Sequence, residues 1–307
     1  PPAAAAAASS SAPILKKTKR SLTFSDLPTD ILLRIAAPFD LLDLWSMSSV
    51  CAQWRKSLNP LREAMVLVRW GKRFKHGDCK IKPSQEKALD SFLRGADRGS
   101  AAAMVDAGLM CWEMGRKEEA KRLYARAAEM GYPAAQCNLG LCYLQDNESK
   151  PEEAVKWFYR AAESGYARAQ YNLGLCLHKG RGTVCSLTDA AIWYLKAAEG
   201  GYVRAMYNAS LCYSDVEGGL NRDLRRARMW MKRAADHGHS KAQLEHGLDL
   251  YYAGDLIKAL LYLELATRAG ENAAVNARDS ILQGLPQTSR DLALLSVDKW
   301  KPINSVK

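Results

Sequence analysis

The sequence has 307 residues, of which 48% are hydrophobic and 25% are charged, and its formal net charge is +11. No apolar run approaches the roughly 20 residues that cross a bilayer, so we expect no membrane-spanning segment. The charge is uneven, because residues 1–87 contain 15 Lys and Arg against 7 Asp and Glu, whereas residues 88–307 contain 29 against 26. The near neutrality of the larger part argues against nucleic-acid binding there.

The first segment, residues 1–20, is rich in Ala, Ser and Pro and ends in the basic run Lys16-Lys-Thr-Lys-Arg20. Such a composition predicts a solvated, disordered tail that has no packed core. Two alternatives stay open for it, a nuclear localisation patch and an organellar transit peptide.

The next segment, residues 21–60, contains two predicted helices, one opened by Leu27-Pro-Thr-Asp-Ile-Leu-Leu-Arg-Ile35 and one over residues 43–55. Pro38 is expected to shorten or kink the helix in which it falls. The Leu-Pro opening, followed later by Val-Cys-x-x-Trp-Arg, resembles an F-box. The alternative is a pair of amphipathic helices that cap the following domain, since periodicity alone also yields apolar faces.

The F-box resemblance implies a partner, the Skp adaptor of cullin-type ubiquitin ligases. About 40 residues bury too little surface to be stable alone, so the apolar faces of this segment need a partner or a neighbouring domain. The residues expected at the adaptor contact are those that match the family: Leu27, Pro28, Ile31, Leu32, Ile35, Leu44, Val50, Cys51 and Trp54.

Residues 61–87 are predicted to contain a helix over 61–70 and a basic linker over 71–83. Basic and aromatic residues alternate in the linker, which is a pattern compatible with nucleic-acid contact. Because no nucleic-acid-binding fold surrounds it, we favour a solvated connector.

An internal repeat begins near residue 88. Glycines recur at Gly99, Gly131, Gly165, Gly201, Gly238 and Gly270, at intervals of 32, 34, 36, 37 and 32 residues. Each has an alanine eleven residues before it and another four residues after it. We call these six glycines the anchor glycines. A period of this length predicts two antiparallel helices per unit, stacked as a solenoid.

Each anchor glycine is expected to end a helix in the left-handed conformation. Bulky residues stand eight and seven positions before the anchors, and small residues such as Gly140 and Gly174 stand nine positions after them. The bulky side chains are predicted to pack into the holes left by the small residues, so that neighbouring helices approach closely.

The unit resembles a Sel-one-like repeat, a relative of the tetratricopeptide repeat, through phrases such as Gly165-Tyr-Ala-Arg-Ala-Gln-Tyr-Asn-Leu-Gly-Leu-Cys176. The predicted fold is therefore all-α, with a small helical F-box before an αα-hairpin solenoid of about five repeats and capping helices over residues 88–283. The tail, residues 284–307, either folds over the last repeat or remains free.

Cysteine and histidine residues show no metal-ligand spacing. Cys142, Cys176 and Cys212 each stand eleven residues after an anchor glycine, so their even spacing follows from the repeat. We expect reduced core cysteines, no metal and no cofactor, and a cytoplasmic or nuclear protein.

No catalytic motif is present, and the chain is interpreted as a non-catalytic adaptor. The F-box would dock a Skp adaptor, and through it cullin, while the solenoid would hold an unknown protein substrate for ubiquitination. The alternatives are an interaction scaffold without ligase function and an RNA-binding helical repeat protein, for which salt-sensitive RNA retention would be diagnostic.

The candidate target-binding strip uses the positions three and seven after the anchor glycines, which lie one helical turn apart on a surface expected to be concave. Its members are Asn138, Arg168, Asn172, Arg204, Asn208 and Lys241. Guanidinium and amide groups in a row suit an extended or acidic peptide. The alternative is that the asparagine amides bond neighbouring backbone.

Overall fold

The computed structural model describes residues 27–36, 41–78, 80–145, 149–215 and 219–303. The predictions for residues 1–20 and for Pro38 lie outside this part of the chain. The described residues form α-helices, a short 3₁₀ helix and an isolated bridge between Asp78 and Ile81. The predicted all-α fold is confirmed, and no described helix has the length and apolar character that a bilayer crossing needs.

The N-terminal unit has three helices, which are α1 (Thr29–Ala36), α2 (Leu41–Ser48) and α3 (Ala52–His76). The single helix predicted over residues 43–55 is wrong, because the chain turns between α2 and α3. Ser48 and Ser49 donate their hydroxyls to the carbonyls of Leu44 and Ser46, both at 2.6 Å. The extended residue Cys51 then caps α3, since its Sγ accepts the N–H of Trp54 at 3.4 Å.

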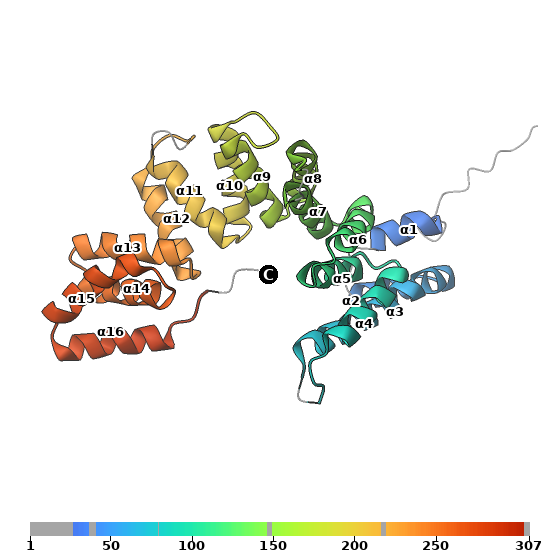
Figure 1. Ribbon diagram of the computed structural model, residues 1–307, viewed down its shortest axis with the longest axis horizontal. Coiled ribbons are helices and arrows are strands. Elements are labelled where there is room, and N and C mark those ends of the chain that lie inside the picture. The colour runs from blue at the N-terminus through green and yellow to red at the C-terminus, as the bar shows by residue number, and fades with distance from the viewer. Residues whose placement is uncertain (1–26, 37–40, 79, 146–148, 216–218, 304–307) are drawn as a thin grey trace, which may run out of the picture.

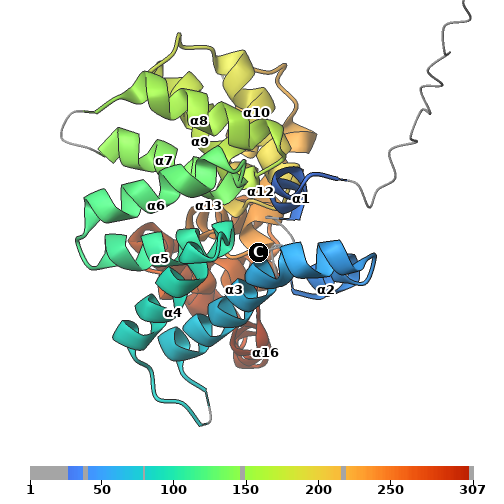
Figure 2. The ribbon, with the colours of Figure 1, turned by 90° about the vertical axis from the view of Figure 1, so that its right-hand side faces the viewer.

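Helix α3 is longer than the sequence suggests, and it connects the two parts of the molecule. Its 25 residues run through Pro60 and include residues 71–76, so the basic linker is shorter than predicted. Met65 packs against both the core of the N-terminal unit and the core of the first repeats. Figure 2 shows α1 and α2 beside one end of α3, and α4 (Gln85–Asp97) alongside α3.

Beyond α4, antiparallel helix pairs follow one another around an arc (Figure 1). We call the two members of each pair the first and second helix of a repeat. The first helices are α5 (Ala101–Glu113), α7 (Pro133–Gln145), α9 (Ala167–Lys179), α11 (Val203–Ser214) and α13 (Ser240–Tyr252). The second helices are α6 (Lys117–Glu129), α8 (Pro151–Glu163), α10 (Leu187–Glu199), α12 (Leu224–Asp236) and α14 (Leu256–Arg268).

The anchor glycines make the turn from each second helix to the next first helix. All six have positive φ, between 81° and 92°, which is the left-handed conformation that the repeat pattern predicts. Nine residues after an anchor, the small residue lies against a ring: a Cβ on Gly140 would stand 2.7 Å from Phe158, and one on Gly174 would stand 2.7 Å from Tyr194. The bulky residue seven positions before the next anchor glycine therefore fills the predicted hole.

The C-terminal end is covered by the tail that the sequence left undecided. A 3₁₀ turn (Asn272–Ala274) leads into α15 (Val275–Gly284), and α16 (Gln287–Lys299) packs against α14. The chain then returns to the turn between α12 and α13, where Trp300 and Pro302 lie over Gly238 and the N–H of Ile303 donates to the Asp236 carbonyl at 3.1 Å. The tail thus folds over the last repeats.

Two histidines are built into this end of the solenoid. His239 accepts the N–H of Ala242 at 3.3 Å, which caps α13, and its ring stacks on Tyr207 at 4.6 Å. His246 packs edge-on against Tyr262 at 4.7 Å. Burial is the main cause that lowers the pKa of both histidines below the ordinary 6.5, and nearby cations, Arg204 beside His239 among them, lower it further.

We predict that Gly140→Val destabilises the protein by about 1 to 3 kcal/mol, because the added side chain must displace the fully buried ring of Phe158. Urea unfolding followed by circular dichroism measures the loss. Gly284→Ala is the matched control, since no atom lies within 4 Å of its Cβ position. Equal stability of Gly140→Val and the parent chain would contradict the packing described here.

We also predict that the C-terminal repeats lose stability as the pH falls below about 6.5. The folded protein holds His239 and His246 at depressed pKa values, so the unfolded chain binds protons that the folded chain excludes. The stability contribution is complete above the unfolded pKa and is lost as acid drives protonation. Thermal unfolding across this range is the measurement.

The control for this pH dependence is a double variant, His239→Asn with His246→Phe, in which Asn retains an N-cap side chain. It should flatten the pH profile, whereas replacing the exposed His76 by Asn should not. An unchanged profile in the double variant would exclude these two histidines as its cause.

Candidate functional site

The N-terminal unit has its own small apolar core. Leu32 and Ala36 of α1 meet Leu44 of α2 and Trp54, Leu58 and Leu61 of α3. These positions follow helical spacing on each element, so one face of each helix is buried. The core of this unit therefore requires the first part of α3 as well as α1 and α2.

The nine residues predicted to contact an adaptor divide into two groups. Five of them face this core, namely the buried Leu32, Leu44 and Trp54 and the partly buried Leu27 and Cys51. The other four, Pro28, Ile31, Ile35 and Val50, lie exposed. Ile31 and Ile35 stand one turn apart on α1 and are 43% and 47% exposed. The exposed group is the part of the predicted site that a partner can reach.

Two further apolar side chains are exposed on α2 and were not predicted. Leu42 is 76% exposed and Trp45 is 55% exposed, and the Arg62 guanidinium stacks 3.6 Å above the Trp45 ring. The sequence contains a signal for them. Leu42 and Trp45 are three residues apart, so they lie on the same face of the helix. The buried Leu44 lies on a different face.

The first half of the predicted target-binding strip is engaged between repeats. Asn138 on α7 is buried, and its Oδ1 accepts a hydrogen bond from Arg168 on α9 at 3.4 Å. Asn172 on α9 donates to Cys137 Sγ on α7 at 3.5 Å. These contacts link α7 to α9, so the asparagines serve the stacking of neighbouring repeats here, through side chains and not through backbone groups.

The second half of the strip has a different environment. Arg204 and Lys241 are exposed at the starts of α11 and α13, and Asn208 lines a cavity described below. Glu245, at the position equivalent to Asn208 in the next repeat, accepts the Tyr207 hydroxyl at 2.6 Å. The strip is therefore a mixed polar surface with three exposed cations, Arg168, Arg204 and Lys241, of which Arg168 also donates to Asn138.

A row of cavities continues along the same face of the first helices. Each lies between two successive first helices, over a side chain of the second helix between them. The cavities have volumes of about 140 Å³ between α5 and α7, 450 Å³ between α9 and α11, and 430 Å³ between α11 and α13. They are lined by the leucines ten residues after the anchor glycines, which are Leu109, Leu141, Leu175, Leu211 and Leu248.

These leucines were not predicted from the sequence, although their constant offset from the anchor glycines was a usable signal. They stand three residues beyond the polar positions of the strip, one further turn along the same face. The polar strip and the row of cavities therefore form one surface, which we call the first-helix face.

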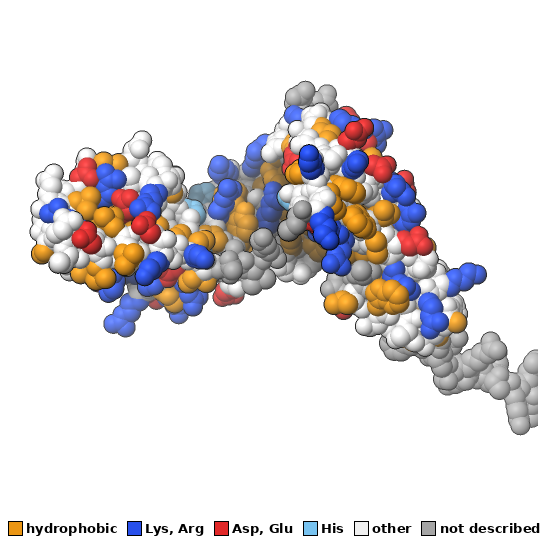
Figure 3. All heavy atoms as spheres, turned by 90° about the horizontal axis from the view of Figure 1, so that it is seen from below, with side chains coloured by type: hydrophobic (Ala, Val, Ile, Leu, Met, Phe, Trp, Pro, Cys, Tyr) orange, Lys and Arg blue, Asp and Glu red, His pale blue; other side chains and the backbone are white. Residues whose placement is uncertain are grey.

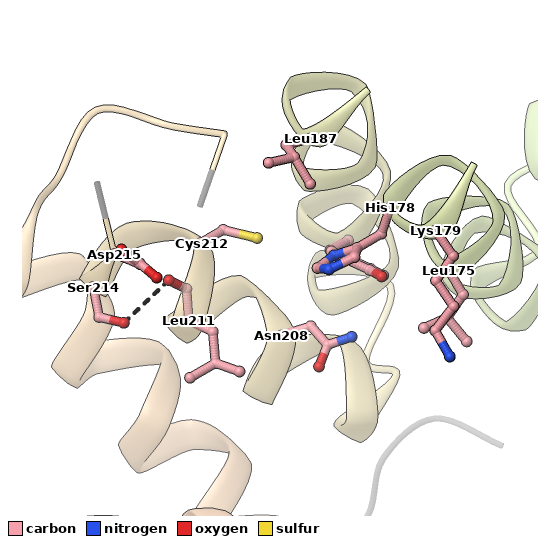
Figure 4. Close-up of a pocket in the computed structure, with 10 residues that line it drawn as sticks. Leu175, His178, Lys179, Leu187, Asn208, Leu211, Cys212, Ser214 and Asp215 are labelled. Carbon is pink, nitrogen blue, oxygen red and sulfur yellow. Dashed lines mark hydrogen bonds between the residues drawn. The ribbon is translucent and has the colours of Figure 1, made fainter. Parts of the chain in front are cut away.

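The α9–α11 cavity combines apolar walls with polar groups (Figure 4). His178 from α9, Leu187 from α10 and Asn208 and Cys212 from α11 converge on it. Tyr194 of α10 lines its inner wall, and burial raises the pKa of that phenol well above its ordinary value. Burial also raises the pKa of the Cys212 thiol to about 11, so the thiolate needed for nucleophilic chemistry is scarce at neutral pH. The arrangement suits binding.

Metal binding has no supporting geometry in the described ranges, where no group of three His, Cys, Asp or Glu side chains is close enough to hold an ion. Cys142, Cys176 and Cys212 are buried, which agrees with the core position predicted from their place in the repeat.

Two protein families match this chain, and the boundary between their matches falls within α3. Residues 24–62 match the F-box domain, and residues 64–100, 101–132, 133–166, 167–202, 203–239 and 240–271 match the Sel1 repeat. The six matched repeats exceed the five complete units expected, because the end of α3 pairs with α4. An Arabidopsis thaliana protein that is named an F-box protein is 53% identical over 284 residues, which cover 91% of this chain and 81% of the relative.

Solved structures agree on the fold. A Sel1 repeat protein from Oxalobacter formigenes superposes with a TM-score of 0.64 at 25% identity, over 82% of this chain and 77% of that one. A protective antigen of uropathogenic Escherichia coli with an SLR fold gives 0.64 at 24% identity over 83% of this chain, which spans only 56% of the antigen. The chain therefore belongs to the F-box proteins in which the F-box is followed by Sel1 repeats.

Proposed function

We propose that this chain is the substrate-recognition adaptor of an SCF-type (Skp–cullin–F-box) E3 ubiquitin ligase. The F-box docks the Skp adaptor, and through it cullin, and the solenoid holds a protein target for ubiquitination. The observation that carries the proposal is that α1 and α2 leave large apolar side chains exposed although the F-box already has a closed core.

The exposed apolar group consists of Ile31, Ile35, Leu42, Trp45 and Val50, each more than 40% accessible. Soluble chains rarely leave so many large apolar side chains exposed within one small unit unless a partner covers them. Figure 3 shows apolar side chains exposed among both basic and acidic ones on the N-terminal half of the molecule. A protein partner with an apolar surface is the partner that such side chains favour.

The adaptor works without catalysis of its own in this proposal. A ligase adaptor raises the effective concentration of its target near the charged transfer enzyme, so it needs two docking surfaces and a fixed geometry between them. The F-box surface and the first-helix face supply the surfaces, and α3 supplies the connection. We propose a cytoplasmic or nuclear location for this activity.

An interaction scaffold without ligase function is the second candidate, supported by the solenoid alone. It needs the same first-helix face but no Skp contact, so the F-box surface separates the two functions. An RNA-binding role has weaker support, since acidic and basic side chains are interspersed over the C-terminal end of the solenoid in Figure 3.

We predict that Ile31→Lys with Ile35→Lys weakens binding to a co-expressed Skp adaptor at least about 30-fold, because two apolar anchors at the centre of an interface are lost. Both side chains are exposed, so the fold should be unchanged. Binding is measured by calorimetry on purified chains, and circular dichroism checks the fold.

The matched control is Leu292→Lys with Leu295→Lys, which places the same charges on two exposed leucines of α16 at the other end of the molecule. It should bind the adaptor like the parent chain. Failure of the parent chain itself to bind would reject the ligase proposal and leave the scaffold.

A further inference from the structure

We infer that the second half of α3 binds an amphipathic helix of a partner protein, and that this helix carries acidic side chains beside its apolar stripe. The surface consists of Arg62, Val66, Arg69, Trp70 and Arg73, and we call it the α3 face. Helical spacing brings these five residues to one side of α3. Four of them follow residues 24–62, which match the F-box, so the surface goes beyond the proposed Skp contact.

The second half of α3 is the first helix of the first repeat. Gly71 lies against the Phe92 ring as Gly108 lies against the Tyr124 ring, so the two glycines occupy the same position in successive repeats. The first match to the Sel1 repeat, over residues 64–100, also begins within α3. Residues of α3 can therefore be compared with those of later first helices at the same offset from this glycine.

Three positions of the α3 face are buried in the later repeats. Val66, Trp70 and Arg73 stand five residues before, one residue before and two residues after Gly71. At these offsets α5, α7 and α9 have side chains that are at most 3% exposed, namely Ala103, Ala107, Met110, Ala135, Leu139, Cys142, Ala169, Leu173 and Cys176. In α3, by contrast, Val66 is 43% exposed and Trp70 is 41% exposed, and the Arg73 side chain is 40% exposed.

The cover that the later first helices have at these positions is a helix. Each packs against the second helix of the repeat before it, as α5 packs against α4 and α7 against α6. The arc begins at α3 and α4 (Figure 1), and α1 and α2 meet only the first part of α3, through Trp54, Leu58 and Leu61. The α3 face is therefore the open end of the solenoid, which a helix in the place of a preceding second helix would close.

The apolar part of the face suits such a helix. Val66 and Trp70 lie one turn apart, and Trp45 of α2 extends the apolar surface, since its ring lies 3.6 Å from the Arg62 guanidinium. The face runs for about 17 Å along α3, which is about three turns. Second helices such as α6 and α8 have 13 residues each, so a helix of that length would cover the face.

The charges on the α3 face specify an acidic partner. Its charged members are Arg62, Arg69 and Arg73. Of the carboxylates nearby, Asp78 accepts from Arg73 at 2.6 Å, and Glu63 pairs with Arg98 of α4 at 3.2 Å. Both carboxylates thus already have a cation, and the face is left with an excess of guanidinium groups. Carboxylates of a partner would form charge-assisted hydrogen bonds with them.

Three other occupants fit this surface less well. Residues 1–26 of this chain contain four Lys and Arg against one Asp, so like charges would meet. A nucleic acid would set phosphates against Val66 and Trp70, whereas protein–nucleic acid interfaces are more polar. A second copy would offer α16 at the other end of the solenoid, where the exposed Leu292 and Leu295 share a face with Lys299, which repeats the positive charge.

The test is a selection from displayed helices of about 18 residues, a length that favours helix formation in water. An apolar stripe of Leu and Ile is fixed, and the other positions vary among Glu, Lys, Gln and Ala. The immobilised full-length chain should enrich Glu over Lys beside the stripe at least about fivefold. Enrichment that ignores charge, or the retention of no helix, would overturn the inference.

Three variants locate the binding. Val66→Glu should lose the selected helices, whereas Ile192→Glu, the same change on a residue of α10 that is 42% exposed, should keep them. Arg69→Glu should lower the preference for Glu over Lys. Circular dichroism checks that each variant folds. Retention that survives Val66→Glu, or an unchanged preference in Arg69→Glu, would overturn the inference.

Further measurements on the same chain separate the other occupants. Single-stranded RNA should not displace the selected helices, and sedimentation should show no self-association as the concentration rises. Displacement by RNA would assign the face to nucleic acid, and a dimer that Leu292→Lys with Leu295→Lys abolishes would assign it to a second copy. Either result would overturn the inference.

Skp binding separates this inference from the proposed function. Val66→Glu should bind the Skp adaptor like the parent chain, because Val66 lies outside the matched F-box. Loss of both Skp and helix binding in this variant would make the adaptor the occupant and overturn the inference of a separate partner. A parent chain that binds acidic helices but no Skp adaptor would reject the ligase proposal and leave the α3 face.

Discussion

The structure depends on one repeated contact, in which a large side chain of a second helix fills the space above a glycine of the preceding first helix. Tyr124 lies over Gly108, Phe158 over Gly140, Tyr194 over Gly174 and Leu263 over Gly247. Phe92 makes the same contact with Gly71, and Gly71 belongs to α3. Because the start of α3 lies in the F-box core, the contact that closes each helix pair also joins the F-box to the first pair, α3 and α4.

The continuous packing from the F-box through α3 into the repeats fixes the position of the F-box surface relative to the first-helix face. The exposed apolar side chains of α1 and α2 and the cavities of the first-helix face are carried by one series of packed helices, in which α3 runs from the F-box core into the core of the first repeats. A protein that brings a target to a transfer enzyme gains from such rigidity, because a flexible connection dilutes the effective concentration that the adaptor supplies.

The sequence was most informative where a backbone or packing requirement restricts the residue type. Positive φ and close ring contact both require small residues, so the anchor glycines and Gly140 or Gly174 revealed the repeat. The break between α2 and α3 was missed because Ser48, Ser49 and Cys51 are all compatible with a helix, and only their side-chain hydrogen bonds end one and begin the next. The cavities were missed because their leucines look like core residues until the neighbouring helices are placed.

The most direct test of the rigid connection is a distance measured by pulsed electron paramagnetic resonance between spin labels at Ser46→Cys on α2 and Glu199→Cys on α10. Cys51, Cys79 and Cys185 are first replaced by Ser so that only these sites react. We expect one narrow distance distribution, and Gly71→Val should broaden it by displacing Phe92. A broad distribution with Gly71 intact would contradict the account, since the F-box would then move independently of the solenoid.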